Sequence, residues 1–121
     1  MQDYFKFIIS QSYQAYRPIE EVIHELSQAP NNQVEIKEFP VPFDIMDCFF
    51  ASAWRRPELY LEENFRAAVS ALAKCPDELL VPLLHRLESD LRTGIWDEKY
   101  GYLRSLETYE GGYRFLITSK I

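Results

Sequence analysis

Three short runs of β-branched and aromatic residues set the first constraint on the fold. They lie at residues 5–10, 34–39 and 113–118, and each has the length and composition of a β-strand. A helical pattern separates the first two runs, and a long helical region precedes the third. This order predicts an α/β domain in which the last strand lies beside the first two.

Residues 1–42 are predicted to form a strand–helix–strand unit. Pro18 suits the first turn of a helix, and the two glutamates that follow it are favoured by the helix dipole. The run at 34–39 alternates at first, as expected for a strand with one wet face, whereas residues 10–17 are predicted to be a loop. The two strands of such a unit are expected to be parallel, with a right-handed crossover.

Residues 43–108 carry helical patterns with several breaks. Asp44 is a good N-cap for a first helix, which Pro57 should end. A second helix, a third one that contains Pro82 and a short fourth one follow, with apolar residues at helical spacing. Residues 109–121 then supply the final strand, so the chain is predicted to be a single domain in three parts.

The composition excludes several classes of function. The formal net charge is −6, whereas a nucleic-acid surface is usually basic. No run is long and apolar enough to predict a membrane span, and the first residues lack the pattern of a signal peptide. Cys48 and Cys75 are expected to be reduced thiols of a cytoplasmic protein, with a single disulfide as the alternative.

A further set of motifs points to one protein family. The motifs are FPVP at 39–42, WRRPE at 54–58, YL at 60–61, DL at 90–91, GIW at 94–96 and GYRFL at 112–116. With these residues the chain resembles a group of bacterial S-adenosylmethionine-dependent methyltransferases of the Rossmann-like class I. The resemblance covers roughly residues 30–118 and extends less closely to the N-terminal 30 residues.

The resemblance implies that the chain is the C-terminal half of such a methyltransferase. It implies a partial Rossmann-like fold with a three-stranded mixed sheet, in which the strand at 113–118 lies antiparallel in the middle, between those at 5–10 and 34–39. The helices within 43–108 would be the insertion that caps the substrate pocket. The chain departs from the family at Cys48, where a glycine is more common, and it lacks the family's first half.

The residues of a cofactor site are missing from the sequence. A methyltransferase of this class needs a glycine-rich turn between its first strand and the following helix, and an acidic residue at the end of the second strand. The chain has four glycines, and none of them follows a strand and opens a helix. The chain alone is therefore expected to bind no S-adenosylmethionine and to be inactive unless a partner supplies the cofactor site.

Six residues are candidate substrate contacts, on the strength of the resemblance and of their chemistry. An arginine can bind an anionic substrate, and aromatic rings can line a pocket. The alternatives are structural: a first-turn acid of a helix, rings in the core, and arginines that bridge helix ends. The candidates are Asp47, Trp54, Arg55, Arg56, Tyr60 and Trp96.

No complete catalytic or metal-binding constellation is visible. Asp44 and Asp47 could form a carboxylate pair, but they also suit the start of a helix. His24 and His85 lie on different predicted helices without the spacing of a zinc motif, so a solvated position is expected for each. Cys48 and His85 could form a nucleophilic pair; the alternative is that Cys48 is an inert, buried thiol. The sequence leaves open whether the protein is an enzyme.

The missing half predicts a partner. The strand expected at 5–10 would present an open apolar edge, guarded only by Lys6, and such edges recruit other strands. Two partners would cover this edge: a second copy in a homodimer, or a separately encoded half that binds S-adenosylmethionine. The alternative function is a non-catalytic interaction module derived from the same fold. The sequence does not reveal the methyl acceptor.

Overall fold

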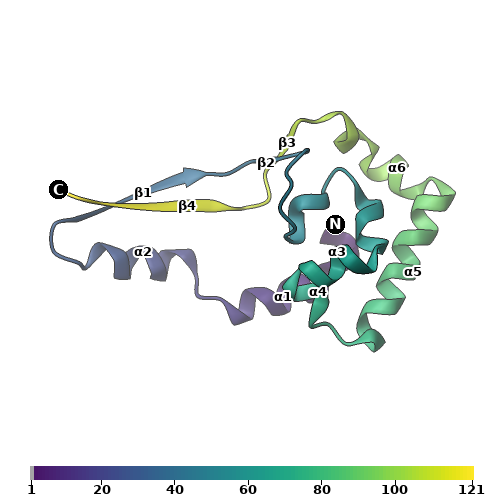
Figure 1. Cartoon of the computed structure of the whole chain (residues 1–121), viewed down its shortest axis with the longest axis horizontal. Coiled ribbons are helices and arrows are strands. Elements are labelled where there is room, and N and C mark those ends of the chain that lie inside the picture. The colour runs from purple at the N-terminus through teal and green to yellow at the C-terminus, as the bar shows by residue number, and fades with distance from the viewer. Residues whose placement is uncertain (1) are drawn as a thin grey trace.

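A helical body and a long two-stranded ribbon make up the molecule (Figure 1). The structure, a computed structural model, describes residues 2–121, without the side chains of residues 2, 13 and 15. The ribbon projects from the helical body, and the C-terminus lies at its far end. The helices are α1 (Gln2–Ala15), α2 (Ile19–Ser27), α3 (Glu63–Ala68), α4 (Ser70–Ala73), α5 (Asp77–Thr93) and α6 (Ile95–Tyr100), with 3₁₀ helices η1 (Phe50–Ala53), η2 (Pro57–Leu61) and η3 (Gly101–Ser105); the strands are β1 (Asn32–Glu38), β2 (Val41–Pro42), β3 (Thr108–Tyr109) and β4 (Arg114–Lys120).

The ribbon is an antiparallel pair of β1 and β4. Asn32 lies opposite Lys120 at its outer end, and β2 and β3 form a second short antiparallel pair next to the helical body. The strands predicted at 34–39 and 113–118 are confirmed, each with a shift of its bounds. The antiparallel orientation of the last strand relative to the strand before it is also confirmed.

The strand predicted at residues 5–10 is wrong, because these residues lie inside α1. Tyr4, Phe5 and Ile8 are buried whereas Phe7 is 54% exposed, which is the pattern of one helix face rather than of an alternating strand. A short apolar run fits a strand and a buried helix equally well. The chain therefore begins helix–helix–strand, and α1 also replaces most of the predicted loop at 10–17.

The predicted three-stranded sheet is wrong as well, because one of its three strands was expected at residues 5–10. Within residues 2–121, β4 pairs with β1 alone, and each of the two sheets has two strands. The last strand does not lie in the middle of a sheet, since the run expected on its other side is helical. No parallel strand pair or right-handed crossover occurs in this part of the chain.

The region at 43–108 is helical, but its first half differs from the prediction. Asp44 lies in an exposed turn rather than at an N-cap, and the short η1 takes the place of the expected first helix. The second predicted helix is divided into α3 and α4 at Val69, whose backbone is extended (φ −105°, ψ 107°). α5 and α6 agree with the pattern, and Gly94 ends α5 in the left-handed conformation that favours glycine (φ 84°).

Aromatic rings fill the centre of the helical body. The ring centroid of Phe5 lies 5.7 Å from that of Phe50 and 5.2 Å from that of Tyr60, within the range of favourable ring pairs. The Tyr4 hydroxyl donates a hydrogen bond of 2.7 Å to a carboxylate oxygen of Asp90, which joins α1 to α5. α1 is thus a central element of the body, and the cavity described next lies beside it.

Candidate functional site

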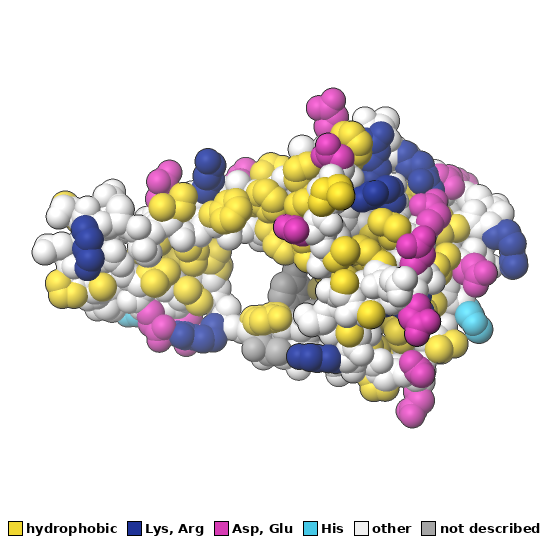
Figure 2. All heavy atoms as spheres, viewed as in Figure 1, with side chains coloured by type: hydrophobic (Ala, Val, Ile, Leu, Met, Phe, Trp, Pro, Cys, Tyr) yellow, Lys and Arg dark blue, Asp and Glu magenta, His cyan; other side chains and the backbone are white. Residues whose placement is uncertain are grey.

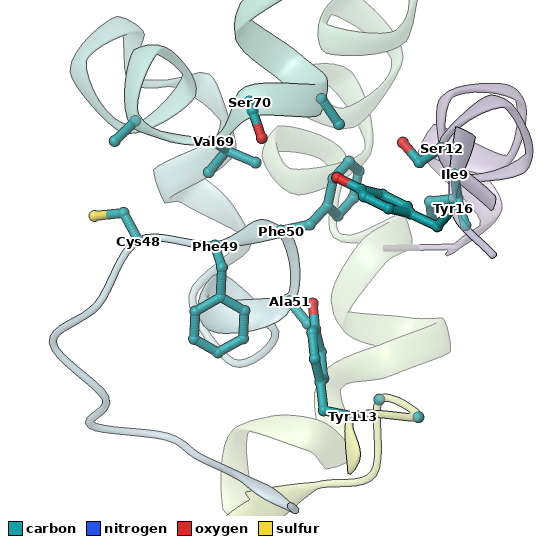
Figure 3. Close-up of a pocket in the computed structure, with 14 residues that line it drawn as sticks. Ile9, Ser12, Tyr16, Cys48, Phe49, Phe50, Ala51, Val69, Ser70 and Tyr113 are labelled. Atoms are coloured by element: carbon teal, nitrogen blue, oxygen red, sulfur yellow. The ribbon is translucent and has the colours of Figure 1, made fainter. Parts of the chain in front are cut away.

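A cavity of about 440 Å³ lies beside α1 (Figure 3). Its wall comes from four segments that are distant in sequence: the second half of α1, residues 48–51, the junction of α3 with α4, and the turn before β4. Small-molecule sites usually have volumes of about 300–1,000 Å³. The cavity is therefore the candidate binding site of this chain.

The junction of α3 with α4 supplies a wall of small side chains. The extended backbone at Val69 separates the two short helices, and its side chain is buried. Ala68, Ser70 and Ala71 flank this break and line the cavity. In Figure 3 the Ser70 hydroxyl points from this junction into the open space. A continuous helix would turn these positions to different faces, so the break itself forms the wall.

Phe49 and Phe50 line the opposite side, where hydrogen bonds hold the backbone. The Tyr60 hydroxyl donates a bond of 2.6 Å to the Phe50 carbonyl, and the Ser52 hydroxyl donates one of 2.7 Å to the Phe49 carbonyl. Burial raises the pKa of Tyr60, so its hydroxyl stays protonated, and remains a donor, well above neutral pH. The Phe49 ring lies edge-on to that of Tyr113, with centroids 5.1 Å apart.

Two glycines form the turn that brings Tyr113 to the cavity. A Cβ atom on Gly111 would lie 3.1 Å from a ring carbon of Tyr113, and Gly112 has a left-handed backbone (φ 84°). The Glu110 carboxylate accepts hydrogen bonds from Arg114 at 2.7 Å and from the Gly112 backbone N–H at 2.8 Å. These bonds, with that of Arg114 first, lower the pKa of Glu110. The turn therefore stays fixed with a charged Glu110 outside the cavity.

The cavity wall contains hydroxyl groups but no charged side chain among its described lining residues. Figure 3 shows the hydroxyls of Ser12, Tyr16, Ser70 and Tyr113 pointing toward one common space from three different segments. The remaining lining residues are alanines, aromatic and aliphatic residues, glycines and Cys48. Such a wall can bind a neutral molecule by apolar contact and hydrogen bonds, but it does not contain a carboxylate or imidazole for acid–base chemistry.

None of the six predicted substrate contacts is among the described residues that line this cavity. Trp54, Tyr60 and Trp96 are each at most 3% exposed and belong to the core. The Trp54 ring stacks on that of Tyr109 with centroids 5.5 Å apart, and the guanidinium of Arg104 lies 4.7 Å from the Trp96 ring centroid. These contacts fit the structural alternative for the three rings.

The other three predicted contacts lie nearer the surface. Asp47 and Arg56 are exposed, and Arg55 is half-buried with its guanidinium 4.1 Å from the ring centroid of Phe43. A second cavity, lined by His85 among others, has none of the six residues among its described lining either. Their role as substrate contacts stays a prediction.

The titratable groups outside the cavity form no metal site among the described side chains. No three His, Cys, Asp or Glu residues cluster there, and His24 and His85 are both exposed on separate helices. Cys48 and Cys75 are free thiols; burial, with a smaller effect of Asp77, raises the pKa of Cys75. No helix between residues 2 and 121 has the length and apolar character that a bilayer crossing requires.

The sequence analysis missed the cavity residues Ser12 and Tyr16, because residues 10–17 were predicted to be a loop. Ser12 lies three positions after Ile9, another residue that lines the cavity, so the two share one face of α1, and this spacing was the available signal for Ser12. Tyr16 lies just after the helix and had no such signal. The contributions of Val69 and Gly111 had no such signal, since they depend on segments that meet only in the folded chain.

Comparison with known proteins supports one fold. No protein-family model and no curated protein matches the chain. A solved structure that does match is that of a protein from Anabaena variabilis ATCC 29413, provisionally assigned as a methyltransferase from an antibiotic biosynthesis pathway. The match has 36% identity and a TM-score of 0.90 over 99% of this chain, and it covers 48% of the Anabaena protein. This chain therefore has a methyltransferase-like fold and spans about half the length of the protein that it matches.

Proposed function

We propose that this chain is the C-terminal, substrate-binding part of an S-adenosylmethionine-dependent methyltransferase-like protein, inactive without a second, cofactor-binding part. One observation carries the proposal: 99% of this chain matches the Anabaena protein at 36% identity, yet only 48% of that protein is matched. In this proposal the helices between β2 and β3 cap the substrate, and the cavity beside α1 receives it.

The positions of the glycines support the absence of a cofactor site from this chain. Gly94 ends α5, Gly101 begins η3, and Gly111 and Gly112 form the turn before β4. A dinucleotide-type site places glycines between a strand and the helix that follows it, so that the backbone approaches the ligand closely. None of the four glycines has that position, so S-adenosylmethionine is proposed to bind only when another part supplies its site.

The ribbon supports the need for a partner. The open edge expected at residues 5–10 does not exist, because α1 occupies these residues, but the outer edges of β1 and β4 are unpaired in the described chain. Ile36, Phe115 and Ile117 on the ribbon are 43–52% exposed, and Figure 2 shows hydrophobic side chains along its visible face. Open edges and apolar faces of this kind favour association, here with the cofactor-binding part or with a second copy.

A non-catalytic interaction module is the second candidate function. The same exposed ribbon favours it, and so does a cavity wall that has no carboxylate or imidazole among its described lining residues. The two candidates differ in one respect that can be measured: only the first requires that this chain complete a cofactor-binding protein.

A chimera distinguishes the two candidates. In it, this chain replaces the matched 48% of the Anabaena protein, and calorimetry measures S-adenosylmethionine binding by the chimera, the parent protein and the isolated chain. We expect the parent and the chimera to bind and the isolated chain to give no heat. Heat from the isolated chain would contradict the missing cofactor site. A chimera that folds, as judged by circular dichroism, but does not bind would favour the interaction module.

A further inference from the structure

The charge of the described cavity wall is the first feature that selects a ligand. The chain carries many charged residues, yet every described residue that lines this cavity is uncharged. A charged ligand that enters such a site loses part of its hydration and gains no counter-charge from the described wall residues, which disfavours the charged form. The wall therefore selects for a neutral ligand.

The rings around the cavity select for a flat ligand. Phe49 lies edge-on to Tyr113 at 5.1 Å, and Phe50 lies edge-on to Phe5 at 5.7 Å, so these rings are held by other rings of the protein. Fixed aromatic faces and edges bind a planar aromatic molecule with little loss of side-chain entropy. The small residues Ala68 and Ala71 leave the volume of about 440 Å³ in which such a molecule fits.

The hydroxyl groups select for oxygen on the ligand. The hydroxyl of Ser12 comes from α1, that of Tyr16 from the residue just after α1, and that of Ser70 from the α3–α4 junction. All three point toward the same space (Figure 3). A hydroxyl group both donates and accepts hydrogen bonds, so these groups can pair with a hydroxyl or carbonyl oxygen of the ligand.

We propose that this cavity binds a neutral, planar aromatic molecule that carries a hydroxyl or carbonyl oxygen. The identification of that molecule as the methyl acceptor rests on the proposed function, whereas its binding to this chain does not. The proposed ligand site is the cavity beside α1, which none of the six candidate substrate contacts lines.

Two small aromatic probes test the selection for a neutral ligand. Calorimetry at pH 7, without S-adenosylmethionine, compares 2-naphthol, which is neutral, with 2-naphthoate, which has the same rings and a negative charge. We expect 2-naphthol to bind the chain at least about tenfold more tightly, because the carboxylate finds no partner in the wall. Equal binding of the two probes, or tighter binding of 2-naphthoate, would overturn the proposal, and so would a failure of 2-naphthol to bind.

Matched variants test whether the cavity is the site. Ala68→Phe adds a ring to a lining residue, and Ala67→Phe adds the same ring to the exposed neighbour that does not line the cavity. We expect Ala68→Phe to abolish 2-naphthol binding and Ala67→Phe to retain it. Unchanged binding by a folded Ala68→Phe variant would place the probe elsewhere.

A milder pair keeps the test valid if the larger substitution disturbs folding. Ser12→Ala removes one lining hydroxyl from α1, and Ser10→Ala removes an exposed hydroxyl from the same helix. The loss of one neutral hydrogen bond is expected to weaken 2-naphthol binding by about fivefold in Ser12→Ala alone. Equal affinity of these two variants would contradict the proposed role of the hydroxyls. Because no cofactor is present, failure here and failure of the chimera to bind S-adenosylmethionine are separate results.

Discussion

Two tyrosine hydroxyls in the helical body link its stability to high pH. Burial, followed by the hydrogen bond to Asp90, raises the pKa of Tyr4, and burial raises that of Tyr60. A tyrosine of the unfolded chain titrates near about 10. Above that pH the unfolded state releases protons that the folded state retains, so the unfolded state binds fewer protons and the free energy of unfolding falls as pH rises.

The expected result is a free energy of unfolding that decreases above about pH 10. Tyr4→Phe removes one of the two hydroxyls with a raised pKa. The free energy of unfolding of this variant should therefore fall less steeply at alkaline pH than that of the wild type. At pH 7 the same variant should be less stable by about 1–2 kcal/mol, since the bond to the Asp90 carboxylate is lost. Urea titrations between pH 7 and 11 measure both effects. Tyr102→Phe, at a position that is 64% exposed, is the control, and an alkaline slope for Tyr4→Phe equal to that of the wild type would contradict the assignment.

The turn before β4 contains a glycine with a left-handed backbone, whereas the backbone of Gly101, at the end of α6, is not left-handed. Gly112 has φ 84°, whereas Gly101 has φ −57° and space for a Cβ atom 3.7 Å from that of Asp97. Gly112→Ala should therefore lower the free energy of unfolding by about 1–2 kcal/mol. Gly101→Ala should be neutral or stabilise by about 0.5 kcal/mol, because it restricts the unfolded chain. Urea unfolding compares the pair, and equal losses would show that the left-handed backbone does not limit this turn.

At the level of elements, amphipathic segments were predictable and segments fixed by distant contacts were not. The helices α2 and α5 have a clear helical period in the sequence, and the two strands of the ribbon are runs of β-branched and aromatic residues; the structure confirms these four elements. The segment before η2 has apolar residues at helical spacing, yet it forms only the short η1. The carbonyls of Phe49 and Phe50 accept hydrogen bonds from the hydroxyls of Ser52 and Tyr60, which hold the backbone in this shape. The cavity escaped prediction because its wall joins four such segments.

The period of α1 was hidden by one exposed aromatic residue. Phe7 interrupts the buried set of Tyr4, Phe5 and Ile8 and turns it into a short apolar run that only Lys6 breaks, which a strand explains equally well. Helical geometry predicts a difference between neighbours. Ile8→Ala should cost about 2–4 kcal/mol of stability because Ile8 is 4% exposed.

Phe7→Ala is the matched control for Ile8→Ala. Because Phe7 is 54% exposed, its truncation should change the free energy of unfolding by no more than about 0.5 kcal/mol. A strand buried on both faces would be damaged by either substitution. Similar losses for the two variants in urea unfolding would therefore count against the helix and in favour of the original prediction.

At the scale of the whole molecule, the helical body and the ribbon differ in how much of their apolar surface is covered. Rings and helices enclose the core of the body, whereas the ribbon has two strands and projects from it (Figure 1). A two-stranded pair is marginally stable by itself in water. α2 contacts β1, and Asn32 donates a hydrogen bond of 2.6 Å to the Leu26 carbonyl, but β4 has no second strand in the described chain.

The ribbon is therefore expected to mediate association. Without the cofactor-binding part, the wild-type chain at micromolar concentration should sediment with a mass above its monomer mass of 14.3 kDa. The double variant Phe115→Glu, Ile117→Lys should remain monomeric. Lys37 lies opposite Phe115 and Glu35 lies opposite Ile117, so each new charge gains an opposite charge across the strands. Such pairs contribute about 0.2–1 kcal/mol each and help the ribbon itself to stay paired.

The control places a charge on apolar surface outside the ribbon. Met46 is 92% exposed, so Met46→Lys should leave both folding and association unchanged. A wild-type mass of 14.3 kDa at micromolar concentration would contradict association through the ribbon. If the double variant associates as strongly as the wild type, the contact lies elsewhere on the molecule. If the double variant alone is monomeric, the apolar face of β4 carries the contact, because strand pairing at the backbone is the same in all three proteins.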